Sequence, residues 1–148
     1  MQSIDSQITE LVLAMEFSTM ESMEDFKRYA RELGDGPFNP PSYYDLLNQE
    51  IYLNVEMSKV LNATLVIKGR NELKLNKLKL DTRGLILCAL RADQDVTKKK
   101  QLIRQALDNF PKQLTLMGEE TDDAEKSRKQ RMDIQIYMKK CEEILASV

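Results

Sequence analysis

The chain has 148 residues, of which 42% are hydrophobic and 31% are charged, and its net charge is −2. This composition excludes an intrinsically disordered chain, and the length suits one domain with a substantial core. The longest uninterrupted apolar run, residues 85–90, is too short to cross a bilayer. Because the N-terminus also lacks a cationic start followed by an apolar stretch, we expect a soluble, cytoplasmic protein with no membrane partner.

Hydrophobic periodicity predicts two helices near the N-terminus. Apolar residues from Ile4 to Met15 recur at helical spacing and predict a helix over 4–17. A second helix should carry Met23, Phe26, Ala30 and Leu33 on one face and end at Gly34. Three of the four prolines then follow within eight residues, which indicates a loop or hinge. The predicted domain therefore has an N-terminal helical pair (1–33), a Pro/Gly loop (34–41) and a main bundle (42–148).

A long helix should begin near Ser42, whose hydroxyl is suited to cap it. Four apolar residues recur every seven positions: Leu46, Leu53, Val60 and Ile67. Met57 fills the intermediate position of the heptad between Leu53 and Val60. This spacing is typical of a coiled-coil seam. Further apolar residues lie off the seam, so the helix should bury two sides. The seam could meet a second copy of the chain, or the helix could be the central helix of a monomeric bundle.

The segment after Gly69 has an ambiguous pattern. Its leucines partly alternate with Asn and Lys over 73–80, so a β-hairpin turning at 68–71 is one interpretation. Leu, Lys and Glu are good helix formers, and no β-branched residue occurs between Ile67 and Thr82. We therefore favour a helix over 71–92.

Two more helices complete the prediction. Asp95 or Thr97 should cap the first, and Pro111 should kink or end it. An acidic linker over 119–125 leads into the last helix, whose apolar stripe repeats in steps of four and three from Ile134 to Val148. The expected fold is all-α: a single-domain bundle of five or six helices with a long central, coiled-coil-like helix.

The charge is distributed unevenly along the chain. Residues 1–57 have a balance of −8, residues 58–112 a balance of +8, and the remainder a balance of −2. The acidic and basic parts could pack on each other within the chain. Alternatively, the basic middle could offer phosphates or an acidic protein the following contacts: Arg70, Lys74, Lys77, Lys79, Arg83, Lys98, Lys99, Lys100 and Arg104. No aromatic residue lies between Tyr52 and Phe110, so nucleic acid would be bound through backbone phosphates and not by base stacking.

Catalytic motifs are missing from the sequence. There is no histidine, which excludes Ser-His and Cys-His nucleophile pairs and histidine metal sites, and no glycine-rich phosphate loop occurs. The two cysteines, Cys88 and Cys141, lie in apolar stretches and are expected to be buried thiols. Glu21 with Glu24, and Glu119 with Asp122, have the spacing of Mg²⁺-binding helix pairs. However, all four lie at predicted helix starts, where acids also stabilise the helix dipole. No cofactor or metal site is predicted.

These patterns favour a protein that binds and does not catalyse. The leading hypothesis is a helical adaptor or oligomerising protein that binds other macromolecules, through a protein partner or by self-association along the seam. A nucleic-acid-binding accessory factor that uses the basic middle segment is the second hypothesis. A Mg²⁺-dependent nucleotide hydrolase is the third and is supported least.

Overall fold

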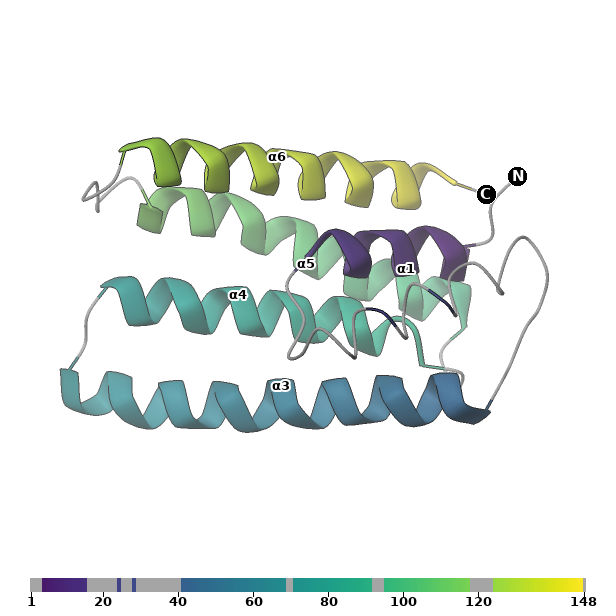
Figure 1. Cartoon of the computed structure of the whole chain (residues 1–148). Helices are drawn as coiled ribbons and strands as arrows, with labels where there is room; N and C mark the ends of the chain where they lie inside the picture. The colour runs from purple at the N-terminus through teal and green to yellow at the C-terminus, as the bar shows by residue number, and fades with distance from the viewer. Residues whose placement is uncertain are drawn as a thin grey trace.

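A computed structural model describes residues 4–15, 24, 28, 41–68, 71–91, 95–117 and 124–147. Within these residues the chain forms five helices and no strand, so the predicted all-α fold is confirmed (Figure 1). They are α1 (Ile4–Ala14), α3 (Pro41–Lys68), α4 (Asn71–Cys88), α5 (Val96–Met117) and α6 (Ala124–Ala146). Of the predicted second helix, only Glu24 and Arg28 are among the described residues. Residues 34–40 of the predicted Pro/Gly loop also lie outside them.

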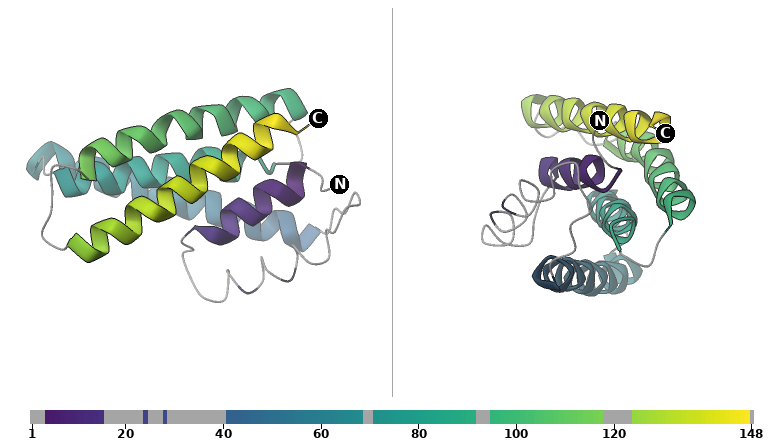
Figure 2. Two further views of the ribbon diagram at one scale, coloured as in Figure 1. Left: turned by 90° about the horizontal axis from the view of Figure 1, so that it is seen from above. Right: turned by 90° about the vertical axis from the view of Figure 1, so that its right-hand side faces the viewer.

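The middle of the bundle is occupied by α4. It packs against α3 on one side and against α5 and α1 on others, while α6 packs against α5 and α1. In the end-on view of Figure 2, α3 lies at one edge below α4, and α6 lies at the opposite edge. The longest helix is α3, with 28 residues, but it packs chiefly against α4. The prediction that the long helix is central is therefore not confirmed.

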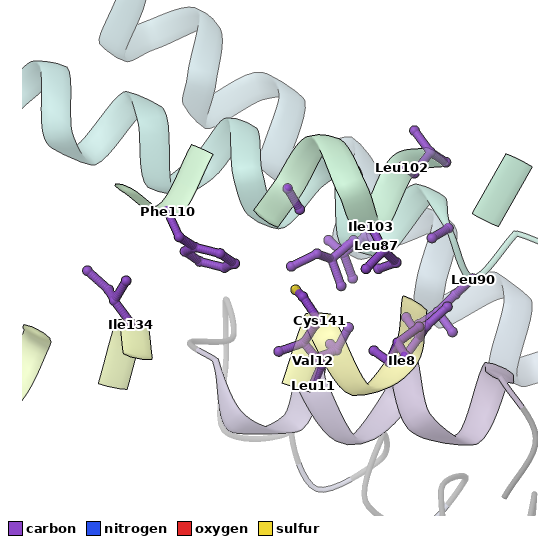
Figure 3. Close-up of a cluster of buried hydrophobic side chains, with 14 of the residues drawn as sticks. Ile8, Leu11, Val12, Leu87, Leu90, Leu102, Ile103, Phe110, Ile134 and Cys141 are labelled. Atoms are coloured by element: carbon purple, nitrogen blue, oxygen red, sulfur yellow. The ribbon is translucent and has the colours of Figure 1, made fainter. Parts of the chain in front are cut away.

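The hydrophobic core lies between α1, α4, α5 and α6. Figure 3 shows Ile8, Leu11 and Val12 of α1 close to labelled side chains of α4 and α6, and each of the three is at most 1% exposed. Phe110 is equally buried, and its ring centroid lies 5.9 Å from that of Tyr137 on α6. From α3, only Leu47 is in the fully buried apolar core of the described residues. Most of the burial that stabilises the bundle therefore involves the other four helices.

Helices α3 and α5 begin with different kinds of residue. Helix α3 begins at Pro41, one residue before the predicted cap Ser42. Proline suits the first helical position, because its φ is already helical and no hydrogen bond is lost by the absence of its N–H. At α5, Asp95 is the cap as predicted: its Oδ1 accepts a hydrogen bond from the backbone N–H of Lys98 at 2.7 Å. Pro111 lies inside α5, which continues to Met117.

The segment from Asn71 is helical, which resolves the alternative of a hairpin in favour of the helix. It ends at Cys88, earlier than the predicted residue 92. The backbone then tightens into turns, with Leu90 N–H donating to Leu87 O and Arg91 N–H donating to Cys88 O. The Lys99 ammonium donates to the carbonyls of Ala89 and Arg91 at 2.8 and 3.3 Å. This buried side chain therefore caps the C-terminus of α4.

None of the described helices is both long enough and apolar enough to span a membrane.

Candidate binding groove

One side of α3 exposes apolar side chains to solvent. Tyr52, Met57 and Val60 are 64%, 52% and 65% exposed, and Val55 is 45% exposed on the other flank of the helix. Scattered exposed apolar residues are normal on a protein surface. Four on three consecutive turns of one helix are less common, and two of them, Met57 and Val60, lie together on one flank.

A groove of about 620 Å³ runs beside this face of α3. One wall is α3 and the other is α6, while α4 and α5 form the floor. Its apolar lining comes from four helices and from the residue that follows α1: Met15, Leu53, Met57, Val60, Leu61, Leu80, Phe110, Ile134 and Tyr137. Met15 directly follows α1 and closes one end of the groove. Near this end, the Tyr137 hydroxyl donates a hydrogen bond to Ala14 O at 3.0 Å.

The groove has a polar floor that joins α3 to α4. Arg83 Nη2 lies 2.9 Å from Oε2 of Glu50, whose side chain is fully buried, and Arg83 Nη1 donates to Asn54 Oδ1 at 3.2 Å. Asn54 in turn donates from Nδ2 to Leu80 O at 2.8 Å. A buried ion pair contributes little net stability, but it fixes geometry because either partner alone would be a buried charge. The network therefore holds α3 in one register on α4.

Gly84 allows this close approach of the two helices. A Cβ atom at position 84 would lie only 2.9 Å from Asn54 Nδ2, the atom that bonds Leu80 O. Gln113 of α5 adds a further polar contact to the floor, because its Nε2 donates to the Thr82 hydroxyl at 3.1 Å. Thr82 itself donates to Leu78 O within α4.

A second hollow, of about 540 Å³, lies on the opposite flank of α3. Val55, Ser58 and Lys59 line it from α3, facing Lys77 and Asp81 of α4. The polar groups here bond to one another: Asp81 accepts from the Ser58 hydroxyl at 2.8 Å and pairs with Lys77 at 2.7 Å. A hollow therefore borders each flank of α3, and the one on the flank that faces α6 is the larger of the two.

The structure divides the predicted oligomer seam. Leu46 is half-buried against the core, whereas Leu53, Met57 and Val60 line the groove. The side chain of Ile67 lies outside the described residues. Sequence reasoning missed the rest of the lining, above all Leu80, Phe110, Ile134 and Tyr137. These residues belong to α4, α5 and α6, and the apolar spacing within each helix does not show which of its residues line a groove.

Many of the predicted cationic contacts have partners within the chain. Arg83 and Lys99 are buried, and Lys99 pairs with Asp5 of α1 at 2.7 Å. Lys77 pairs with Asp81, and the Lys100 ammonium donates to Ser147 O. Lys79 is half-buried in the groove lining, and Arg70 lies outside the described residues. Three members of the set are exposed, and they lie on α4 and α5: Lys74, Lys98 and Arg104.

The acidic and thiol groups give no sign of a catalytic centre in the described part of the chain. Of the two acidic pairs, only Glu24 is described, and the described residues hold no cluster of three or more potential metal ligands. Cys88 and Cys141 form no disulfide within the described residues. Burial, together with the neighbouring charge of Glu142, raises the pKa of the Cys141 thiol from 9.0 to about 12. This thiol is therefore protonated at neutral pH and is a poor nucleophile.

Comparison with known proteins gives no family, curated protein or solved structure that matches this chain.

Proposed function

We propose that this protein is a non-catalytic helical protein that binds other macromolecules, and that an amphipathic helix is bound in the groove between α3 and α6. The observation that carries the proposal is the exposure of Met57 and Val60 at the rim of a groove whose lining is mainly apolar. The heptad spacing of the sequence also predicts that Met57 and Val60 form a contact surface, without reference to the groove.

The position of α1 supports a helix as the proposed occupant. Helix α1 packs against both α6 and α4, and its end at Ala14 is followed by Met15 at the mouth of the groove. The groove thus continues the space that α1 occupies beside α6 and α4, and α3 forms its other wall. Amphipathic helices commonly bind in such apolar grooves through side chains spaced three and four residues apart.

The extent of the apolar surface favours a macromolecule over a small ligand. A volume of about 620 Å³ would also suit a small molecule. A ligand confined to the groove would leave Tyr52 and Val55 exposed, because neither residue lines it. A partner that also covers the outer face of α3 would bury Tyr52, whereas Val55 lies beside the second hollow on the opposite flank.

Binding of nucleic acid is a weaker proposal. It depends on the basic middle segment, where Arg83 and Lys99 are buried in intramolecular contacts and Lys77 and Lys100 also bond within the chain. These contacts support packing of the basic segment on acidic partners such as Glu50 and Asp5. Fewer cations are then left to neutralise phosphates, and affinity for a nucleic-acid backbone depends on their number.

Selection of displayed helical peptides tests the proposed function. Peptides of about four turns are selected on the folded wild-type protein and then counter-selected on Val60→Asp. We expect enriched sequences with apolar residues at i, i+3, i+4 and i+7 that do not bind the variant. Val96→Asp serves as the matched control, because Val96 is 50% exposed on α5 and does not line the groove. The proposal would be refuted if every enriched peptide bound the wild-type protein, Val60→Asp and Val96→Asp equally well.

A further inference from the structure

We infer that the helix bound in the groove is basic. Lys or Arg side chains flank its apolar stripe and pair with the carboxylates of Glu56 on α3 and Asp133 on α6, and a hydrogen-bond donor within the stripe bonds the amide oxygen of Gln113 on the floor. This inference rests on the proposed function, because it concerns the chemistry of the helix that the groove binds.

Gln113 brings an unused hydrogen-bond acceptor to the floor of the groove. The residue lies on α5 and is only 2% exposed. The Thr82 hydroxyl gives its one proton to Leu78 O, so it must accept the hydrogen bond from Gln113 Nε2. This fixes the orientation of the amide. No donor among the described residues bonds Gln113 Oε1, which leaves this oxygen for a partner.

The amide oxygen of Gln113 is open to the groove. Within the described part of the chain, every sealed side-chain oxygen of a buried residue has a hydrogen-bond partner. Because Oε1 of Gln113 accepts no hydrogen bond there, it is not sealed, and the groove is the hollow that this residue lines. A partner that filled the groove with apolar atoms alone would bury this acceptor without a hydrogen bond, which is unfavourable. A partner that offers a donor avoids this penalty.

The two walls of the groove each carry a carboxylate. Glu56 is half-buried on α3, and Asp133 is half-buried on α6. Asp133 forms no ion pair within the described residues. Glu56 contacts Lys59 at 3.3 Å, but the Lys59 side chain is 69% exposed, and an exposed pair of this kind contributes little. Both carboxylates can therefore pair with cations of a bound helix.

The cations of the groove lie on α4 and interact within the chain. Arg83 pairs with buried Glu50 at 2.9 Å, and Lys79 also has an intramolecular interaction. Two further lining residues, Asn76 and Gln130, are amides that can donate or accept, so they favour neither sign of charge. The charges that remain for a partner are those of the two walls, and they are complementary to a cationic helix.

The peptide selection described above tests the flanking charges. On the wild-type protein we expect Lys or Arg to be enriched on both sides of the apolar stripe. The double variant Glu56→Gln, Asp133→Asn should lose this preference. The matched control is Asp45→Asn with Glu143→Gln, which removes the same charge from α3 and α6 at exposed residues that do not line the groove. This control should select the same peptides as wild type.

Fluorescence anisotropy of the most enriched basic peptide makes the comparison quantitative. Its Kd should rise about threefold when either groove carboxylate is removed and about tenfold when both are removed. The control double variant should stay within about twofold of wild type. Raising the salt concentration from about 50 to about 300 mM should weaken binding to wild type more than binding to the groove double variant, because salt screens the ion pairs.

Gln113→Met tests the donor within the stripe. Methionine keeps a similar length but has no amide oxygen. The wild-type protein should select a donor such as Ser, Asn or Trp at one position inside the apolar stripe, and the variant should select an apolar residue there. Circular dichroism of each variant checks that the helical fold is unchanged.

Three results would overturn this inference and leave the proposed function intact. The first is enrichment of peptides with neutral or acidic flanks. The second is an equal loss of affinity in the two double variants, because the effect would then come from net charge and not from the groove. The third is the same peptide consensus on wild type and on Gln113→Met. If no peptide distinguishes wild type from Val60→Asp, the proposed function itself fails, and this inference fails with it.

Discussion

Replacing Lys99 by methionine should destabilise the fold far more than the same change at Lys98. The Lys99 ammonium donates to Asp5 Oδ1, Ala89 O and Arg91 O at 2.7, 2.8 and 3.3 Å, and its side chain is 7% exposed. Methionine fills a similar volume but donates nothing, so the carbonyl of fully buried Ala89 loses this partner.

The size of the effect follows from these contacts. A hydrogen bond to a charged group contributes about 1.5–3 kcal/mol, and the unpaired carbonyl alone costs about 1–3 kcal/mol. Asp5 is 38% exposed and can be solvated by water, so its share is smaller. Replacing the ammonium also removes its own desolvation cost. We therefore expect a loss of about 3 kcal/mol, or a fall in Tm of about 6–12 °C.

Urea unfolding followed by circular dichroism measures this difference, with the m-value checked for constancy. Lys98 is exposed, and only its backbone N–H bonds Asp95, so Lys98→Met should stay within about 0.5 kcal/mol of wild type. Equal stabilities of the Lys98→Met and Lys99→Met variants would refute the assignment of Lys99 as the cap that joins α1, α4 and α5.

Two further predictions follow from the buried groups. Gly84→Ala should destabilise by about 1–2 kcal/mol despite the better helix propensity of alanine, because its Cβ would meet Asn54 Nδ2 at 2.9 Å. In an Asn54→Ala background the same change should be neutral or stabilising, and an equal loss in both backgrounds would exclude this contact as the cause. Native Cys141 should resist iodoacetamide at pH 8 and react only on unfolding, because its pKa is raised to about 12. Labelling of the native thiol at the unfolded rate would contradict its burial. Because the pKa of Cys141 is higher in the folded chain than the unfolded value of 9.0, the protonated thiol contributes to folding stability below pH 9, and this contribution declines as the pH rises toward 12.

The helices could be predicted from the sequence where apolar spacing and local signals agree. The stripe from Ile134 and the cap at Asp95 depend on residues close in the chain, so their local chemistry is visible in the sequence. The early end of α4 could not be predicted in this way. It depends on Lys99, which caps the carbonyls of Ala89 and Arg91 from the following helix.

Only the α3 wall of the candidate groove could be predicted from the sequence. The heptad spacing identified Leu53, Met57 and Val60 as a seam, and the structure places all three in the groove lining. Spacing gives the face of a helix but not the neighbour that the face meets, so the opposite wall from α6 could not be inferred. For the same reason, the charge of Lys99 indicated a surface contact, although a partner 94 residues away holds it inside the fold.

The most direct test of the proposed groove is the affinity of selected helical peptides for the full chain, measured beside the Val60→Asp variant. Our account predicts that these peptides bind the wild-type protein and Val96→Asp alike and lose affinity for Val60→Asp. Equal affinities for all three proteins would contradict it.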